Sequence, residues 1–419
     1  MGRNLKLAAD WNTVPLSSAV SVQKGKIVSN SESENPFSKP YIGAESLDKG
    51  TSKRYVNEPG GVRCGRNDIL MLWDGERSGL CGIGHEGIIS STVARLRLTN
   101  DDLYSRFLYH YLNSQFEYIQ SQRTGTGVPH VPKDLTSLLY VPTPPLPEQH
   151  RIAEILDTVD ETIHQTEQTI EKLQQIKQGM LDDLLTRGID EDGNLRDPEK
   201  HPEQFLETEL GIVPKEWQIV ILKNATIKIQ DGTHFSPQSN SGPYRYITSK
   251  NIKYGYMDIS NTSWISEKEH RKIYNRCDVK PGDILLTKDG VNTGNAAINK
   301  LDEEFSLLSS VAMIRPNKQR LLPGFLLQYL LSPLSQKMIN DIVSGNAITR
   351  ITLEKINELP LLLPKIEEQN QIIKHTNTMD DRIKSEIDYH SKLIKLKKGL
   401  MQDLLTGKVR TNELEEVPV

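Results

Sequence analysis

The polar side chains with the most suggestive spacing lie in the second half of the chain. Residues 231–237 (DGTHFSP) form a glycine-punctuated loop whose threonine and histidine could approach a groove closely. Residues 249–251 (SKN) place a hydroxyl, a cation and an amide side by side. Lysine suits guanine O6 and N7 or a phosphate, and asparagine suits adenine N6 and N7. An ordinary strand end with surface residues would give the same pattern. The residues with this chemistry are Thr233, His234, Ser249, Lys250 and Asn251.

The matching positions in the first half of the chain are Ala44, Glu45 and Ser46. A glutamate can accept a hydrogen bond from cytosine N4, so the two halves should prefer different bases. Phosphate contacts only position a protein, whereas contacts to base edges give sequence preference. Single lysine changes should therefore weaken binding broadly, while changes at Asn251 or Glu45 should relax one position.

No motif in the sequence supplies catalytic chemistry. The Asn/Asp-Pro-Pro-aromatic tetrad of amino-methyltransferases, a glycine-rich S-adenosylmethionine loop and an ATP-binding P-loop are absent. The histidines lack metal-ligand spacing, and the cysteines form no CxxC pair. Cys64, Cys81 and Cys277 indicate reduced thiols rather than a structural zinc or a disulfide. We therefore expect a non-catalytic protein that binds no metal or cofactor itself.

The composition is that of a globular protein with more than one domain. The chain has 419 residues, of which 25% are charged and 36% hydrophobic, and this length is too great for one ordinary core. No apolar run approaches the roughly 20 residues that span a bilayer. The first residues lack a secretory pattern, so we expect a cytoplasmic protein without membrane association.

The net charge of −4 is distributed unevenly along the chain. Residues 1–145 hold 16 Lys+Arg against 14 Asp+Glu, and residues 214–364 hold 19 against 14. Residues 146–213 hold only 6 against 17. The acidity thus lies in one stretch, and the two mildly basic regions are compatible with phosphate contacts.

The chain repeats itself once, with six blocks in the same order in both copies. A period near 210 residues is far too long for a solenoid, so the copies are domain-sized units. The matching blocks are Trp11–Ala19 with Trp217–Ala225, Tyr41–Gly50 with Tyr246–Gly255, Asp68–Gly75 with Asp283–Gly290, Ser91–Arg97 with Ser309–Arg315, Phe107–Leu112 with Phe325–Leu330, and residues 146–189 with 366–409.

Each copy has the same plan, a mixed region with short β-rich runs, then a proline-bearing connection and a long helix. This predicts an α+β fold with two tandem mixed domains separated by two long antiparallel, coiled-coil-like helices, as a pseudo-twofold repeat. The expected boundaries are 1–145 for the first domain, 146–187 for the central helix, 188–213 for a linker, 214–364 for the second domain, 365–409 for the distal helix and 410–419 for a tail.

Both predicted helices carry a narrow apolar stripe. A single such helix could be buried on a globular domain, but two duplicated stripes more simply bury each other. Two units related by a twofold axis would pair their helices in opposite directions, with a mixed domain at each end. A helix of about 38 residues is ~57 Å long, which exceeds one turn of B-DNA at ~34–36 Å. The stripe residues are Ile152, Leu156, Val159, Ile163, Ile170, Leu173, Ile372, Met379, Ile383, Ile387, Leu393 and Leu400.

Taken together, the motifs resemble those of the specificity subunit of type I restriction-modification systems, over essentially the whole chain. In one departure, the first copy begins Ala9-Asp10-Trp11 without the Gly-x-x-Pro lead-in, so its N-terminal edge is expected to be shorter or differently anchored. The motifs are Glu148-Gln149 and Glu368-Gln369, the helix ends 179–186 and 399–406, the lead-in 209–217 (ELGIVPKEW), and residues 231–237 and 246–252.

The resemblance implies two target-recognition domains, each reading one short half-site of an asymmetric bipartite sequence in double-stranded DNA. It also implies partners, namely type I methyltransferase subunits, with two as the expected number, and type I restriction/translocase subunits. S-adenosylmethionine, ATP and Mg2+ would be bound by those partners. The family pattern also makes residues 124–130 and 344–350 groove-facing loops. Further DNA-contact candidates are Lys24, Lys26, Arg77, Thr126, His130, Lys288, Asn292, Thr293, Asn346 and Arg350.

Two other interpretations compete with this one. A helical scaffold of a multi-subunit complex would explain the helices and the acidic stretch, but it leaves two large basic domains unexplained. A methyltransferase or nuclease with its own reader would need the missing catalytic motifs. A neighbouring methyltransferase gene would favour the reader, and its absence would favour the scaffold.

Overall fold

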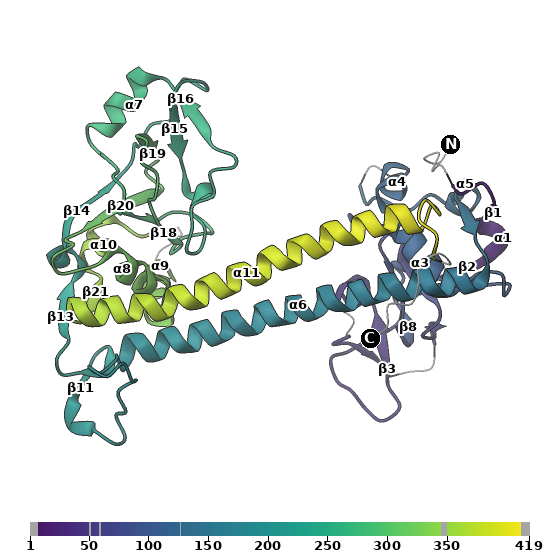
Figure 1. Ribbon diagram of the computed structural model, residues 1–419, viewed down its shortest axis with the longest axis horizontal. Helices are drawn as coiled ribbons and strands as arrows, with labels where there is room; N and C mark the ends of the chain where they lie inside the picture. The colour runs from purple at the N-terminus through teal and green to yellow at the C-terminus, as the bar shows by residue number, and fades with distance from the viewer. Residues whose placement is uncertain (1–6, 50–51, 58–59, 126, 345–349, 412–419) are drawn as a thin grey trace. The chain divides into compact units, whose positions relative to one another are not determined.

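The computed structural model describes residues 7–49, 52–57, 60–125, 127–344 and 350–411. The chain forms two compact units, residues 1–167 with 388–419, and residues 168–387. Two long helices, α6 (Leu146–Thr186) and α11 (Ile366–Leu404), each contribute to both units (Figure 1). Because the units divide within these helices, the domain boundaries expected from the sequence remain a prediction.

The first unit contains a mixed region, here called head 1, that precedes α6. Its helices are α1 (Leu16–Ala19), α2 (Ala44–Lys49), α3 (Ser105–Ser114), α4 (Phe116–Ser121) and α5 (Leu135–Leu138). Its strands are β1 (Asn12–Pro15), β2 (Val20–Lys24), β3 (Lys39–Ile42), β4 (Tyr55–Val56), β5 (Val62–Cys64), β6 (Ile69–Leu72), β7 (Cys81–Gly82), β8 (Gly87–Ile89), β9 (Val93–Leu98) and β10 (Tyr140–Thr143).

The second unit contains head 2, which follows a linker with η1 (Pro202–Gln204) and the hairpin β11 (Phe205–Thr208) and β12 (Gly211–Pro214). The helices of head 2 are η2 (Leu222–Ala225), η3 (Ser249–Asn251), α7 (Glu267–Tyr274), α8 (Pro323–Leu331), α9 (Pro333–Ser344) and α10 (Leu353–Glu358). Its strands are β13 (Gln218–Ile221), β14 (Thr226–Asp231), β15 (Tyr244–Ile247), β16 (Ser263–Ile265), β17 (Ile284–Thr287), β18 (Ala296–Ile298), β19 (Phe305–Leu307), β20 (Val311–Pro316) and β21 (Pro360–Leu363).

The two heads share one topology, which confirms the predicted duplication. An antiparallel sheet has the order β2-β9-β6-β7 in head 1 and β14-β20-β17-β18 in head 2. A second sheet is built around a parallel pair, β3 with β8 and β15 with β19. The first strand pairs with the last in both heads, as β1 with β10 and β13 with β21. Head 2 adds α7 between β16 and β17, where the described part of head 1 has no helix.

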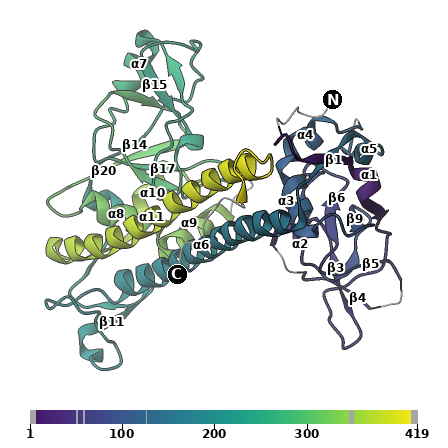
Figure 2. The ribbon, with the colours of Figure 1, turned by 45° about the vertical axis from the view of Figure 1, so that its right-hand side comes forward.

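The central strand of the antiparallel sheet explains why each head contains two small cores. Successive side chains of a strand point to opposite faces of its sheet. In β6, Ile69 and Met71 belong to the core that contains Phe107 and Leu108 of α3, while Leu70 and Leu72 belong to the core that contains Ile42 and Ile89 of the second sheet. The ribbon of β6 lies beside α3 in Figure 2. In β17, Ile284 and Leu286 separate from Leu285 in the same way. A strand that is buried on both faces needs apolar residues at successive positions, as in ILML of β6 and ILLT of β17. All four residues of β6 are buried: Ile69, Leu70, Met71 and Leu72.

The two long helices run antiparallel side by side in each unit (Figure 1). In the first unit, Lys397 Nζ lies 2.5 Å from Asp160 Oδ1. In the second unit, Lys177 Nζ lies 2.5 Å from Asp380 Oδ1. The aspartates are repeat counterparts, and so are the lysines, so the two bridges are one bridge repeated. This confirms the predicted antiparallel pairing. None of the helices in the described ranges is long and apolar enough to cross a membrane.

Most residues of the predicted stripes are buried or half-buried, and one is exposed. Ile387 is 44% exposed, so it does not share the burial of the other stripe residues, and its place in a helix-pair or subunit interface stays a prediction. Steps of 3 and 4 residues from the buried Ile383 lead through Glu386 and His390 to the buried Leu393, which leaves Ile387 off the contact face. The buried members are Ile152, Leu156, Ile163, Leu173, Ile372, Ile383 and Leu393, and the half-buried members are Val159, Ile170, Met379 and Leu400.

Candidate nucleic-acid interface

Head 2 gathers charged side chains where several strands end, a region here called loop cluster 2 (residues 231–234, 249–250, 276, 288–293, 310 and 350). The end of β14 places the buried Asp231 near an arginine, a lysine and a histidine. Its carboxylate is 2.9 Å from Arg276 Nη2, 3.4 Å from Lys288 Nζ and 3.4 Å from His234 Nε2. Arg276 and His234 are about half exposed, so both side chains contact a buried carboxylate and also face solvent.

A second ion pair of loop cluster 2 joins segments that are distant in sequence. Arg350 Nε lies 3.2 Å from Asp289 Oδ1, and the backbones of these two residues form an isolated β-bridge. The Ser310 carbonyl accepts the Lys288 N–H, and the Ser310 hydroxyl accepts the Ser249 N–H. These contacts hold the ends of β17, β20 and η3 together, so Lys250 and Arg350 belong to one surface.

Head 1 has a corresponding loop cluster 1 (residues 24–26, 73–77, 92 and 130) with different charges. Asp74 Oδ1 lies 2.7 Å from His130 Nδ1, and Asp74 Oδ2 lies 2.7 Å from Lys24 Nζ. The backbones of Asp74 and His130 form the same isolated bridge as Asp289 and Arg350. His130 and Lys24 are each about half exposed. The two heads therefore present a nitrogen-bearing side chain, His130 or Arg350, at the same place, each held by an equivalent aspartate.

Strand register shows which side chains differ at matching places. Lys24 lies opposite Ala94, and Asp231 lies opposite Ala312, so Lys24 and Asp231 are equivalent. The Trp73 N–H bonds to the carbonyl just before β9, and the Lys288 N–H bonds to the carbonyl just before β20, which makes these two residues equivalent as well. Head 1 thus bridges Lys24 to Asp74, whereas head 2 reverses the charge at the first position and supplies the cation from Lys288.

The predicted DNA contacts divide by exposure. Four are buried in the folded head: Ser46, Thr233, Asn251 and Lys288. The Asn251 amide accepts from the Thr248 N–H and donates to the carbonyls of Asp258 and Asn261, so it is used within the loop. We retain as candidates the exposed residues Lys24, Lys26, Glu45, Arg77, His130, His234, Lys250 and Arg350 and the half-buried Ser249, Asn292 and Thr293. Thr126 and Asn346 lie outside the described residues.

A duplicated glutamine attaches each long helix to its own head. The buried Gln149 accepts the Tyr104 N–H at 2.8 Å and donates to the carbonyls of Asp102 and Pro144. The buried Gln369 makes the same three bonds, accepting at 2.8 Å from Leu322 and donating to Arg320 and Pro364. One amide satisfies three backbone groups that would otherwise be unpaired, which fixes the angle at which the helix leaves the head.

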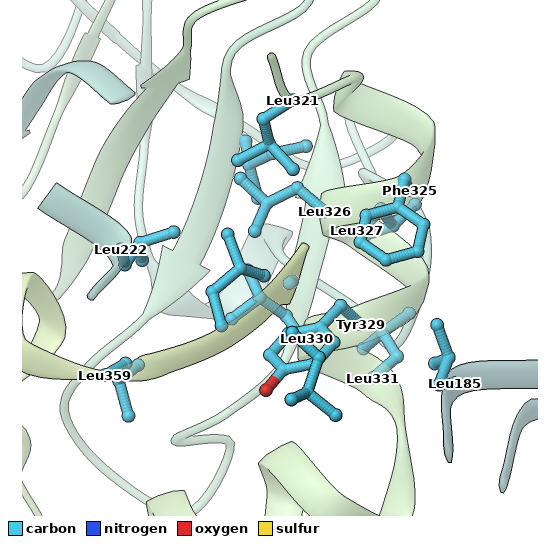
Figure 3. Close-up of a cluster of buried hydrophobic side chains, with 14 of the residues drawn as sticks. Leu185, Leu222, Leu321, Phe325, Leu326, Leu327, Tyr329, Leu330, Leu331 and Leu359 are labelled. Carbon is cyan, nitrogen blue, oxygen red and sulfur yellow. The ribbon is translucent and has the colours of Figure 1, made fainter. Parts of the chain in front are cut away.

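The preceding glutamate binds the segment that follows the other long helix. In the first unit, Glu148 accepts two bonds from Arg410, at 2.8 and 2.9 Å. In the second unit, Glu368 accepts from Arg196, from Trp217 Nε1 at 3.0 Å and from the Ile189 N–H at 2.8 Å. Next to this contact, Leu185 at the end of α6 packs toward Tyr329 and Leu331 of α8 (Figure 3). Both glutamates thus lock a helix start to a helix end.

Sequence reasoning missed three arginines of these sites, although it found the residues they pair with. Arg196 and Arg410 lie ten residues after Thr186 and four residues after Thr406, so the repeat does not align them. Arg276 follows α7, which occurs in head 2 alone among the described elements. A helix-starting Glu-Gln pair that recurs in both copies was the signal available for the junctions.

The described residues contain no group of three or more His, Cys, Asp or Glu side chains that could hold a metal ion. All three cysteines are buried free thiols. Burial raises the pKa of Cys64 to about 11 and that of Cys277 to about 12, which keeps both protonated and unreactive near neutral pH.

The chain matches one protein family twice, at residues 8–175 and again at 214–393, and that family is described as the type I restriction modification DNA specificity domain. The specificity subunit of the type I restriction enzyme MjaVIII from Methanocaldococcus jannaschii is 28% identical over 98% of this chain and 95% of its own length. The EcoBI specificity subunit from Escherichia coli is 24% identical over 90% of this chain and 80% of its own length.

Two solved structures share the fold. The S subunit of a type I restriction-modification system from M. genitalium has a TM-score of 0.57 at 17% identity, covering 96% of this chain and 98% of that one. A chain from a structure on complex assembly and conformational transition of the type I R-M system has a TM-score of 0.53 at 17% identity, covering 96% and 100%. These likenesses confirm the predicted fold.

Proposed function

The chain belongs to the type I restriction modification DNA specificity family, and from that premise we propose that it selects an asymmetric bipartite DNA target, with one half-site read by each head. The observation that carries this proposal is the contrast between the two loop clusters. Equivalent strands and equivalent backbone bonds hold them, yet their side chains differ at Lys24 and Asp231 and at His130 and Arg350. Two loop clusters with the same backbone but different side-chain charges suit two different half-sites.

The exposed cations supply contacts of two kinds. Lys24, Lys250 and Arg350 carry positive charge to the surface, where it can neutralise phosphates and position the duplex. The carboxylates of Asp74 and Asp289 hold His130 and Arg350 in one orientation before DNA arrives. A side chain oriented in advance loses less entropy on binding, which favours a contact to a base edge over a contact without fixed geometry.

The chain itself contributes no catalytic group to this proposal. Type I methyltransferase subunits, two in number, would bind along the long helices, and restriction/translocase subunits would join them. S-adenosylmethionine, ATP and Mg2+ would act on those partners. The complex would work in the cytoplasm, where incoming DNA is met.

Methylome sequencing of cells that carry the whole system tests the proposal. The chain's gene is deleted and then restored on a plasmid, with the neighbouring genes intact. A split methylated motif should disappear on deletion and return on restoration. A motif that persists without the gene would contradict DNA selection by this chain and would favour a scaffold.

A further inference from the structure

Both heads contain the same rigid turn beside the loop cluster, between β6 and β7 in head 1 and between β17 and β18 in head 2. In head 1, the Ser78 N–H bonds to the Gly75 carbonyl and the Gly79 N–H bonds to the Leu72 carbonyl. In head 2, the Thr293 N–H bonds to Gly290 and the Gly294 N–H bonds to Thr287. The paired bonds show that the backbone follows one path in both turns.

Glycines make this path possible and hold it. Gly75 and Gly290 have φ of 108° and 93°, and Gly79 and Gly294 have φ of 97° and 96°, values that L side chains rarely adopt. A glutamine from the following helices pins each turn. Gln120 donates to the Ser78 carbonyl at 2.7 Å, and Gln336 donates to the Gly294 carbonyl at 3.0 Å.

The side chains at the tips of these turns differ in chemistry. Val291 is 99% exposed, although it is apolar and stands on a firmly held backbone. The equivalent residue of head 1 is the exposed Glu76. The preceding aspartates, Asp289 and Asp74, are those that orient Arg350 and His130, so each tip lies two residues from an ion pair of its loop cluster.

A rigid turn that projects a bare valine fits an apolar patch on its ligand, and the major groove offers one in the thymine C5-methyl group. A glutamate at the same place can accept a hydrogen bond from cytosine N4, and it repels phosphates. The repeated backbone thus delivers either an apolar or an acidic probe to one position of a groove.

We propose that Val291 and Glu76 are paired specificity-determining residues, with Val291 contacting a thymine methyl in one half-site and Glu76 accepting from a cytosine in the other. This inference rests on the proposed function, because it assigns two base contacts within it. Beside the basic residues of the loop clusters, each head would thus contact DNA with one residue at the tip of a rigid turn, which is apolar in head 2 and acidic in head 1.

Methylome sequencing of cells carrying the rest of the system tests the inference with two reciprocal variants, Val291→Glu and Glu76→Val. The first should change the methylated motif at one position of one half-site, and the second at one position of the other. Val291→Ala removes only methyl groups, and it should lower the preference for a T·A pair at that position roughly tenfold. This milder variant keeps the test decisive if Val291→Glu does not fold.

The matched control is Ile227→Glu, at a residue of head 2 that is 68% exposed and lies at the other end of β14 from Asp231. Its motif should equal that of the unchanged chain. If the three tip variants also leave the motif unchanged while gene deletion abolishes it, the inference is wrong and the proposed function stands. If gene deletion leaves the motif intact, the proposed function fails.

Discussion

The junctions and the loop clusters of this protein differ in what the repeat has kept. At the junctions, Gln149 and Gln369 make the same three hydrogen bonds at the start of each long helix. In the loop clusters, the equivalent positions Lys24 and Asp231 carry opposite charges. The junctions must hold a long helix at the same angle to its head in both copies. The loop clusters need not contact the same ligand groups in both copies. The difference teaches that the repeat has kept the contacts of the junctions while the side chains of the loop clusters have changed.

The junction glutamines give the largest expected effect. Gln369→Ala leaves the Leu322 N–H and the carbonyls of Arg320 and Pro364 without their partner. The free energy of unfolding should fall by about 3 kcal/mol, because buried unpaired groups cost about 1–3 kcal/mol each. Urea unfolding of the full chain measures this.

Gln149→Ala should cost the same within about 1 kcal/mol, and the exposed Gln402→Ala should cost less than about 0.5 kcal/mol. A large loss for one junction variant and none for the other would break the claimed equivalence of the two junctions.

The lysines of the two loop clusters should respond unequally to the same change. Lys288 is buried against Asp231, so Lys288→Met should destabilise the chain by about 2–3 kcal/mol, since it removes a buried partner of the Asp231 carboxylate and leaves Arg276 as the main one. Lys24 is half exposed, and Lys24→Met should cost less than about 1 kcal/mol. Thermal unfolding followed by circular dichroism compares them, and equal losses would refute the contrast.

The two junction glutamates, Glu368 and Glu148, should differ by a smaller amount in their contribution to stability. Glu368 accepts from Arg196, Trp217 and the Ile189 N–H, whereas Glu148 accepts from Arg410. Glu368→Ala should therefore be less stable than the matching Glu148 variant by about 2 kcal/mol, because it loses two more hydrogen bonds, each with a net contribution of about 1 kcal/mol. Urea midpoints of the two alanine variants test the order, and the reverse order would contradict it.

The sequence predicted those features of the structure that occur in both copies of the repeat, and it missed those that do not align between the copies. Repeated blocks were sufficient for the two-domain α+β fold and for the antiparallel helices. Arg196 and Arg410 escaped because they follow helix ends at different distances. The equivalence of Lys24 and Asp231 follows only from strand register, which sequence alignment did not provide.

Residue type alone was a weaker guide to the candidate site. Asn251 has the chemistry of an adenine reader, yet its amide closes a capping loop, a common local use of asparagine. Lys288 has the charge of a phosphate contact but is only 1% exposed in its ion pair. Burial decides between such roles, and it depends on contacts distant in sequence.

The ion pair between Asp68 and Arg97 gives the smallest expected effect, which appears as a dependence of stability on pH. Burial of Asp68 acts to raise its pKa, but Arg97 and the Gly65 N–H hold that pKa below its usual range. A lowered folded pKa means stability that is present above the unfolded value of about 4 and is lost as pH falls further. Urea unfolding at about pH 7 and about pH 3 should show a smaller loss for Asp68→Asn than for the unchanged chain, and an equal or greater loss would contradict the assignment.

The central claim is that each head reads its own half-site, and a head exchange tests it most directly. Residues 1–145 are replaced by the corresponding region of another specificity subunit, and the methylome of cells carrying the complete system is sequenced. One half of the split motif should change while the other half stays the same. A simultaneous change in both halves would contradict it.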